Sequence, residues 1–424
     1  MKTAIVAGCR TPFIRSGTSF RNLSAIELGK VTVRELLGQA DLPGEGVDRL
    51  VFGTVVHNPH APNIAREVGL GVLPPEVPAS TVSMACASAN QAIADGAALI
   101  ELGHADVVVA GGAESLSRIP ITVSDRLSAT LIRASRARSL KERAGAIAGI
   151  RPRDLIPVQP QIAEPTTGET MGEAAERMAK ENGISREAQD AWALRSHERA
   201  LAGIEDGRLS AEIVPVYTPP GYDEVVEADN GVRADTSLEA LAGLRPAFDR
   251  EHGSVTAGNA SPLTDGAGAV LLMSEDAVRA HGVKPLAWIR SFAVSSLDPG
   301  EQLLQGPAFA APVALDRAGI TMADVDLMEM HEAFAAQVLS NLQWLDSDTF
   351  AREKLGRSSR VGHPDPERIN VMGGSISLGH PFGATGARIT TTLAHELRRS
   401  DGEFGLITVC AAGGLGFAMV LERA

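Results

Sequence analysis

Short apolar, β-branched runs alternate with longer alanine- and leucine-rich stretches along most of this 424-residue chain. This alternation is typical of α/β proteins, in which helices connect strands that are buried on both faces. We therefore predict strands at residues 4–7, 49–55, 107–110, 269–273, 286–291, 325–330, 406–409 and 417–421. The predicted helices include residues 24–39, 87–102, 172–181, 186–202 and 384–399. Because the chain is too long for one ordinary core, we expect two or three packed units.

The order of these elements repeats weakly. The segments TAIVAG, DRLVFGTVV, STVSMACASANQAI, ADVVVAGGAES and GAVLLMS are matched later by LAWIRSF, DVDLMEMHEAFA, RINVMGGSISLGHPFGATG, FGLITVCAAGG and GFAMVLE. The match predicts two similar halves, each with a turn from a strand into a helix. Between them lie proline, glycine and charge clusters such as RPRDLIPVQPQ (151–161), which indicate an inserted loop domain. We predict an N-terminal half at 1–118 plus 251–276, a loop domain at 119–250 and a C-terminal half at 277–424.

The net charge of −13 argues against binding of nucleic acid by the chain as a whole. Residues 125–154 are an exception, since they hold eight Arg or Lys against three acidic residues. Leu140, Ala144 and Ile147 recur there at helical spacing. The segment 126–153 is either a basic amphipathic patch for a ligand phosphate or a peripheral membrane contact, or a solvated helix.

The first residues read as a strand, with no charged leader before them, and no apolar run approaches the roughly 18–20 residues that span a bilayer. The three cysteines, at positions 9, 86 and 410, lie far apart, which favours free thiols in a reducing compartment. We expect a cytoplasmic protein, with Cys9 in the core.

Cys86 is the first candidate for chemistry. An apolar run ends at this residue, and an alanine-rich helix begins immediately after it. A thiol at a helix N-terminus lies near unpaired N–H groups and the positive end of the helix dipole, which favour the thiolate. The small neighbours Ala85, Ala87 and Ser88 would admit a substrate carbonyl. Taken alone, such a cysteine is more often a small buried hydrophobe.

Three further candidates follow in glycine-rich or strand-end settings. His380 lies within GGSISLGHPFGATGAR, where the flanking glycines would leave its imidazole accessible. Cys410 closes a strand before Gly413 and Gly414, which predict a tight hairpin whose backbone N–H groups point at an oxyanion. His331, in MEMHEAFAAQ, follows a strand at a helix start and can donate a hydrogen bond to developing negative charge.

Metal and nucleotide chemistry find little support. His57 and His60 have i, i+3 spacing, but the Asn-Pro between them favours a loop, so we expect no metal site. Neither a G-x-G-x-x-G after a strand nor a P-loop is present, so hydride transfer and nucleotide hydrolysis are not indicated.

Taken together, SMACAS around Cys86, HEAFA, GHPFGATG and the C-terminal Cys-x-x-Gly-Gly resemble the thiolase family in order and spacing, over essentially the whole chain. The resemblance implies a five-layered αβαβα core built from two halves, and a homodimer or larger assembly. It also implies no bound cofactor, with coenzyme A and acyl-CoA as substrates. By the same resemblance, Ser261 in TAGNASPLTDGAGAV, Met171 and Phe334 contact coenzyme A or substrate.

The resemblance implies a mechanism as well. His380 accepts the Cys86 proton, and the thiolate attacks the 3-keto carbon to give an acyl-Cys86 enzyme. Cys410 protonates the departing enolate and then deprotonates the incoming coenzyme A. The backbone N–H groups of Cys86 and Ala412 would hold the tetrahedral oxyanion, and His331 and His380 the enolate oxygen.

Two positions depart from the family's usual signature. It has Asn where this chain has His331, and Cys-x-Gly-Gly-Gly where this chain has Ala412. Both departures, and the basic stretch ending RPRDLIP, resemble the branch that contains the β-subunit of the fatty-acid trifunctional complex. This branch implies degradative thiolysis of longer 3-ketoacyl-CoA in β-oxidation, and a hydratase/dehydrogenase partner subunit.

Three alternatives remain open. A biosynthetic acetoacetyl-CoA thiolase would run the same chemistry toward condensation. A decarboxylating ketoacyl synthase uses one Cys and two His, which would leave Cys410 unexplained. A non-catalytic, lipid-carrying thiolase-like protein predicts that Cys86 alkylates no faster than a free thiol.

Overall fold

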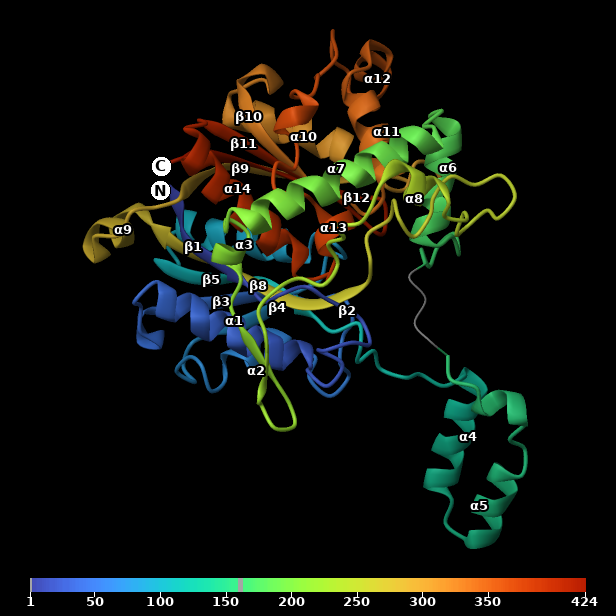
Figure 1. Cartoon of the computed structure of the whole chain (residues 1–424). Coiled ribbons are helices and arrows are strands. Elements are labelled where there is room, and N and C mark those ends of the chain that lie inside the picture. Colours follow the sequence, from blue (N-terminus) through green and yellow to red (C-terminus); the bar gives the residue numbers. More distant parts are fainter. Residues whose placement is uncertain (1, 159–162) are drawn as a thin grey trace.

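One large mixed sheet organises the chain, whose residues 2–158 and 163–424 are described by the computed structural model (Figure 1). The strands lie in the order β10-β11-β12-β9-β1-β8-β5-β3-β4, and β2 (Ile14–Arg15) pairs with β8 beside this path. The N-terminal strands are β1 (Thr3–Arg10), β3 (Arg49–Gly53), β4 (Ala79–Val82), β5 (Val107–Glu114) and β8 (Thr264–Ser274). The C-terminal strands are β9 (Ala287–Ser296), β10 (Val325–Met330), β11 (Phe404–Ala411) and β12 (Leu415–Arg423).

The two halves of this sheet repeat one topology. The order β1-β8-β5-β3 in the first half corresponds to β9-β12-β11-β10 in the second. The parallel pair β3·β5 corresponds to β10·β11, and a parallel bridge from Met328 to Ile369 lies where β4 pairs with β3. The halves join edge to edge, because β1 pairs with β9 from Thr3↔Ile289 to Ile5↔Ala287. The two similar halves predicted from the repeat are confirmed.

Helices form three layers around the sheet halves, which confirms the αβαβα core (Figure 1). The helices α1 (Ala25–Gln39) and α2 (Ile64–Gly69) cover the outer face of the first half, and α10 (Gly306–Ala318) packs on the outer face of the second. Between the halves lie α3 (Ser88–Glu101) and α14 (Thr385–Ser400), which contact each other. One apolar cluster joins both central helices to both halves; its members include Ile93, Ala97, Val108, Leu272, Ile389, Leu393, Ile407 and Met419.

Glycines allow the two central helices to approach closely. A Cβ on Gly386, in the first turn of α14, would lie 2.2 Å from Asn90 Oδ1 and 2.5 Å from Asn90 N on α3. Only hydrogen fits there, so the N-terminal ends of α3 and α14 meet between the two halves of the sheet. The turn between β4 and α3 carries Cys86, and the turn between α13 (Ser375–Leu378) and α14 carries His380.

A long insertion connects β5 to β8. Its helices α6 (Met171–Glu181) and α7 (Arg186–Glu205) pack against α11 (Ala335–Leu345), and α7 also contacts α13 (Ser375–Leu378). The strands β6 (Val216–Thr218) and β7 (Glu224–Val226) form a separate sheet. The remaining elements are η1 (Gly44–Gly46), α4 (Asp125–Arg136), α5 (Leu140–Ile147), η2 (Pro152–Leu155), η3 (Ser210–Glu212), α8 (Leu238–Ala242), α9 (Glu275–His281), η4 (Met322–Asp324), α12 (Asp348–Lys354) and η5 (Pro366–Arg368). Residues 159–161 of the 151–161 cluster lie outside the described residues.

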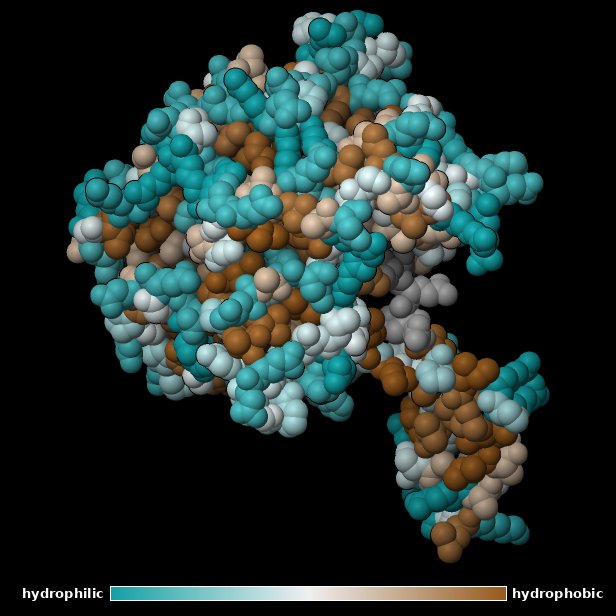
Figure 2. All heavy atoms as spheres, in the orientation of Figure 1, coloured by the Kyte–Doolittle hydropathy of each residue, from teal (hydrophilic) through white to brown (hydrophobic). Residues whose placement is uncertain are grey.

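Residues 121–158, here called the helical arm, project away from the rest of the molecule (Figure 1). The helix predicted around Leu140 exists as α5, but Leu140 itself is 84% exposed. Apolar side chains gather on the arm's visible face in Figure 2. The exposed ones are Ile121, Val123, Leu131, Ile132, Leu140, Ile147, Leu155, Ile156 and Val158. The arm therefore carries an uncovered apolar face together with its basic residues.

The predicted strands and helices are present with shifted ends. The first strand extends to Arg10, and Cys9 within it is buried in the core as predicted. The strand predicted at 49–55 ends at Gly53, and that at 107–110 continues to Glu114. Among the described residues, no helix combines the length and the apolar character needed to cross a membrane.

Candidate active site

Cys86 lies in a strained turn between β4 and α3. Ala85 has φ 45°, a left-handed conformation that costs energy for a residue with a Cβ. The Ser88 hydroxyl stabilises the turn, because its oxygen accepts from Met84 N at 2.9 Å and its O–H donates to Ala85 O at 2.6 Å. Of the three cysteines, Cys86 is the partly exposed one, whereas Cys9 and Cys410 are buried. The turn thus holds the Cys86 side chain in a fixed direction.

His380 occupies the matching turn before α14. Its Nδ1 lies 2.6 Å from Thr385 Oγ1, and its backbone N–H donates to Pro262 O. The expectation of an accessible imidazole is wrong, because His380 is 3% exposed. The neighbouring glycines let other segments pack closely, since a Cβ on Gly383 would lie 2.8 Å from Thr54 Cα.

His331 completes a compact group with Cys86 and His380. The Cys86 sulfur and one ring nitrogen of each histidine all lie within 4.8 Å of one another. The two imidazole rings are 4.1 Å apart between centroids, and the His331 and His380 Nε2 atoms are both buried without a hydrogen-bond partner in the described residues. Two unpaired ring nitrogens therefore lie beside one thiol.

Cys410 and Ala412 approach this group from the β11–β12 hairpin. The predicted tight turn is present, with Gly413 at φ 84° and Gly414 at φ 68°. The backbone N–H groups of Cys86 and Ala412 interact with the Cys86 sulfur. The structure therefore brings the two expected oxyanion donors to one point beside the nucleophile.

The electrostatics of the group favour neutral side chains. Burial raises the pKa of the Cys86 thiol to about 12, against the opposing effect of the Cys86 and Ala412 N–H groups. Burial and, to a smaller extent, Arg388 lower the pKa of His380 to about 3. The expectation that the helix start favours a thiolate is thus wrong for the substrate-free site, because desolvation outweighs the helix terminus.

The second thiol is still harder to ionise. Burial raises the pKa of Cys410 well above its ordinary value, and the neighbouring Cys86 raises it further. Burial, the charge interaction with His380 and the charge of Arg388 lower the pKa of His331 well below its usual range. Both histidines are therefore neutral at pH 7, one suited to accept a proton and one suited to donate a hydrogen bond.

The three residues expected to contact substrate lie around this group. Ser261 N donates to Ala333 O at 3.0 Å, and the segment beside Ser261 forms bridges to both Phe334 and His380. Met171 and Phe334 pack against an apolar cluster that includes Cys410. The structure thus places Met171 and Phe334 against the cluster that holds Cys410, and the segment of Ser261 beside His380.

Sequence reasoning missed the buried polar residues behind the histidines. Ser375 Oγ lies 3.0 Å from His331 Nδ1, and Arg388 contacts both Ser375 and Glu329. Glu332 accepts from Trp192 Nε1, Ser196 Oγ, Asn370 Nδ2 and Ile376 N. Both serines in GGSISLG and the Arg in GATGAR were visible in the sequence, but no pattern marked them as buried.

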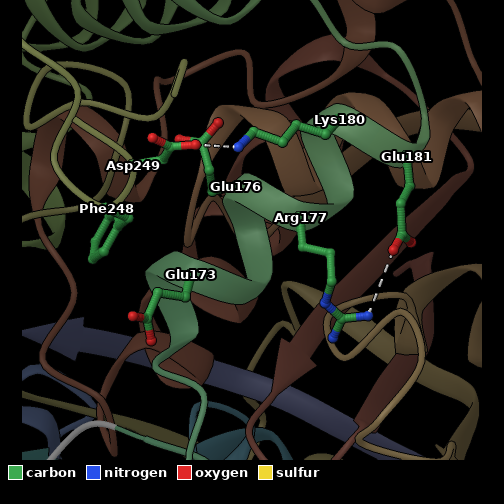
Figure 3. A pocket seen from close by; sticks show the side chains of 7 residues that line it. All are labelled: Glu173, Glu176, Arg177, Lys180, Glu181, Phe248 and Asp249. Carbon is green, nitrogen blue, oxygen red and sulfur yellow. Dashed lines mark hydrogen bonds and ion pairs between the residues drawn. The ribbon is translucent and has the colours of Figure 1, made fainter. Parts of the chain in front are cut away.

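A pocket on α6 lies apart from this group and is lined by charged side chains (Figure 3). Lys180 pairs with Asp249, and Arg177 pairs with Glu169 and Glu181. Glu176 accepts from the backbone N–H groups of Ser254 and Val255. Because these charges satisfy one another, we assign the pocket a structural role.

A bound metal ion would have to use Cys86, His331 and His380 as its ligands. Among the described residues, Cys86, His331 and His380 are the only group of three with metal-ligand spacing, and His57 and His60 are not part of it. A metal there would occupy the space beside the nucleophile that a substrate carbonyl needs. We therefore interpret the three side chains as a catalytic group, and the absence of a resident metal stays a prediction.

Comparison with known families gives two matches that together cover nearly the whole chain. Residues 3–276 match the model described as "Thiolase, N-terminal domain", and residues 283–423 match "Thiolase, C-terminal domain". The 3-ketoacyl-CoA thiolases of Yersinia pestis and Yersinia pseudotuberculosis are 53% identical over 422 residues, which is 99% of this chain and 97% of theirs.

Solved structures of similar proteins superpose on the whole of this chain. The human mitochondrial 3-ketoacyl-CoA thiolase superposes with a TM-score of 0.85 at 33% identity, covering 100% of this chain and 99% of that one. The acetyl-CoA acetyltransferase of Bacillus anthracis gives a TM-score of 0.85 at 34% identity, with the same coverage. The human enzyme in complex with CoA gives 0.83 at 33% identity, covering 100% and 98%.

Proposed function

The chain belongs to the thiolase family, and on that premise we propose that it is a 3-ketoacyl-CoA thiolase of fatty-acid β-oxidation. It transfers the acyl group of a 3-ketoacyl-CoA to coenzyme A through an acyl-Cys86 intermediate and releases acetyl-CoA. The observation that carries this proposal is the convergence of Cys86, His331 and His380 within 4.8 Å, with Cys410 beside them. A single-cysteine condensing enzyme would not need the second thiol.

Acylation begins with a neutral thiol and a neutral imidazole. His380 Nε2 takes the Cys86 proton as the sulfur attacks the keto carbon, which avoids a free thiolate in a desolvated site. The resulting oxyanion accepts hydrogen bonds from the backbone N–H groups of Cys86 and Ala412. One such donor lowers a barrier by roughly 3–4 kcal/mol.

Cleavage of the bond between C2 and C3 leaves the acyl group on Cys86 and the electron pair on the acetyl-CoA enolate. The enolate oxygen accepts hydrogen bonds from His331 and from the now protonated His380. Cys410 donates its proton to C2, and acetyl-CoA departs. The Cys410 thiolate then deprotonates coenzyme A, whose sulfur takes the acyl group, and the protonated His380 returns its proton to the released Cys86 sulfur.

The thioester substrate reaches these groups past Ser261, Met171 and Phe334. Their position beside Cys410 and His380 supports contacts with the pantetheine part of coenzyme A. The degradative direction is supported by the 53% identity to proteins named 3-ketoacyl-CoA thiolase. The human structure in complex with CoA supports coenzyme A as the second substrate.

We also propose that the helical arm binds to the surface of a membrane that contains anionic lipids. Its exposed apolar side chains and its excess of basic residues are the two features that interfacial helices combine. A homodimer and a hydratase/dehydrogenase partner subunit are proposed from the resemblance, and a cytoplasmic location is proposed from the three free cysteines. Sedimentation of the purified protein, alone and with such a subunit, measures the assembly.

The activity test uses a series of 3-ketoacyl-CoA substrates of different chain lengths with free coenzyme A. We expect loss of the ketoacyl enolate absorbance with the wild-type protein and none above background with Cys86→Ala. Equal rates for the two proteins would refute the role of Cys86. No cleavage at any chain length would refute the proposed function.

A further inference from the structure

His331 and His380 are neighbouring neutral imidazoles, so the chemistry of the site depends on which ring nitrogen of each carries the proton. Each neutral imidazole carries one proton, either on Nδ1 or on Nε2, and the hydrogen bond at one nitrogen decides what the other can do. The Nε2 atoms of His331 and His380 have no hydrogen-bond partner in the described residues, whereas both Nδ1 atoms have one. The partners of the two Nδ1 atoms therefore determine the chemistry at the nucleophile.

Thr385 determines the proton position on His380. Its Oγ1 lies 3.3 Å from Pro381 O and 2.6 Å from His380 Nδ1. A carbonyl oxygen can only accept, so a Thr385 hydroxyl that bonds both groups donates its proton to Pro381 O. Thr385 Oγ1 then accepts from His380 Nδ1–H, which leaves a lone pair on Nε2. This is the form that can take a proton from Cys86.

Ser375 has the opposite effect on His331. Arg388 Nη2 lies 3.3 Å from Ser375 Oγ, and a guanidinium can only donate, so Ser375 accepts from Arg388. In the described residues, the one other partner of the Ser375 hydroxyl is His331 Nδ1, at 3.0 Å. The hydroxyl proton therefore goes to Nδ1, and the proton of His331 lies on Nε2.

Burial and ion pairing keep this arrangement in place. Ser375, Arg388 and His331 are fully buried, and Arg388 also pairs with Glu329 at 3.1 Å. The Arg388–Glu329 ion pair lies behind Ser375 and His331, and Glu332 is the next residue along the chain. The Arg388 charge beside Ser375 opposes a second proton on the imidazole of His331.

We propose that Ser375, oriented by Arg388, is a positioning residue that holds His331 as the Nε2–H tautomer, opposite to the tautomer that Thr385 imposes on His380. His331 then presents a permanent N–H donor to the enolate oxygen, while His380 presents a base to Cys86. The inference rests on the proposed function for its catalytic meaning, but the tautomers themselves are measurable without activity. It also gives a reason why His can stand at this position, since the other tautomer would offer the enolate oxygen an acceptor instead of a donor.

A double-mutant cycle tests the coupling of Ser375 to His331. Ser375→Ala should slow thiolytic cleavage of 3-ketoacyl-CoA on the order of tenfold, because the donor to the enolate is no longer fixed. The same variant should leave acylation of Cys86 by a saturated acyl-CoA unchanged, because that step forms no enolate. In a His331→Asn background, Ser375→Ala should have no further effect, since an amide N–H₂ is a donor without any tautomer.

Ser377→Ala is the matched control. Ser377 lies on α13 with Ser375 and is equally buried, but its hydroxyl contacts Gly374 O and Ser196 Oγ, not a histidine. It should leave the ratio of cleavage to acylation at the wild-type value. Equal slowing of both steps by Ser375→Ala, or an undiminished effect in the His331→Asn background, would overturn the coupling.

The tautomer is read directly by ¹⁵N nuclear magnetic resonance of protein labelled at histidine, with the His331 signals assigned by their loss in His331→Asn. We expect a protonated Nε2 and an unprotonated Nδ1 for His331 in the wild-type protein, and a mixture in Ser375→Ala. A protonated Nδ1 in the wild type would overturn the inference even if the enzyme is active. The expected signals in an inactive protein would leave the inference standing and refute the proposed function instead.

Discussion

Cys86 and His380 occupy equivalent positions in the two halves of the molecule. Each lies in the turn that leads into the central helix of its half, α3 or α14, and the close contact at Gly386 and Asn90 brings the two helix starts together. The Cys86 sulfur and a ring nitrogen of His380 therefore lie within 4.8 Å although 294 positions separate them in the sequence. The nucleophile and its base are thus a product of the internal repeat, and neither half contains the pair alone.

Alkylation of Cys86 should have an unusual pH dependence in the substrate-free protein. Because the pKa of this thiol is raised to about 12, the thiolate is a minor form throughout the neutral range. The rate of labelling by iodoacetamide should rise about tenfold per pH unit through pH 10, whereas an ordinary cysteine levels off just above its pKa of about 8.5. Mass spectrometry of the Cys86 peptide measures the rate, with a short thiol peptide as the control. A plateau below pH 8 would show a preformed thiolate.

Replacement of Cys410 should separate the two half-reactions. Cys410→Ala removes the group that protonates the enolate, so turnover should fall by about 10²–10⁴-fold. Acylation of Cys86 by an acyl-CoA should persist, because coenzyme A is a good leaving group that can depart as a thiolate without a proton from Cys410. Intact-protein mass measures the acyl enzyme, and steady-state assays measure turnover. Cys9→Ala, which changes a buried cysteine in β1, is the control and should preserve both acylation and turnover. Loss of acylation in Cys410→Ala would contradict the division of roles between the two thiols.

Much of this arrangement could be predicted from sequence, for identifiable reasons. Buried strands give continuous apolar runs, so the repeat and the layers could be predicted from pattern. Cys86 and His380 were identifiable because each precedes a helix and lies among small residues. Ser375 and Arg388 were not, since a serine in a glycine-rich loop and an arginine on a helix usually face water. Their burial comes from the packing of α14 between the two halves, which no local pattern encodes.

The same packing explains the error at His380. Glycines were expected to expose the imidazole, and they instead admit neighbours that bury it, such as Thr264 against Gly379 and Thr54 against Gly383. Glycine predicts close approach, but not which segment approaches. Likewise, the thiolate expected at Cys86 followed from the helix terminus alone, and the desolvation that opposes it depends on the opposite half of the chain.

The contact between the central helices should be sensitive to a single methyl group. Gly386→Ala places a Cβ 2.2 Å from Asn90 Oδ1, so we expect a loss of about 1–3 kcal/mol in the free energy of unfolding. Activity should fall as well, since the two turns move apart. Gly38→Ala in α1 is the control, because its added methyl group would meet no atom within 4 Å, and it should be neutral or stabilise by up to about 1 kcal/mol. Denaturant titration measures both, and equal effects would contradict the packing argument.

The helical arm should bind anionic vesicles in a salt-dependent manner. Its exposed Arg133 and Arg136 supply attraction that salt screens, and Leu131 and Ile132 supply apolar area. Flotation with vesicles that contain phosphatidylglycerol should show binding at low salt and release at high salt, and neutral phosphatidylcholine vesicles should bind weakly.

Matched variants separate these two contributions. The double change Arg133→Glu and Arg136→Glu should abolish flotation, and Leu131→Ser with Ile132→Ser should weaken it without removing the salt dependence. Arg352→Glu with Arg368→Glu makes the same change of charge at exposed positions outside the arm and should float like the wild type. Absence of salt-dependent binding by the wild type would leave the arm as a solvated element.

Ala412 tests whether a backbone N–H group, and not a side chain, holds the oxyanion. The family's usual glycine differs from Ala412 by one methyl group, so Ala412→Gly should keep kcat within about twofold. Ala412→Pro removes the N–H group that interacts with the Cys86 sulfur and should lower kcat by about 10²–10³-fold. Ala412→Ser, which retains the N–H group, controls for a change of size at this turn. The thermal midpoint of each variant separates a local loss from unfolding, and a proline variant with wild-type kcat and an unchanged midpoint would exclude this donor from the mechanism.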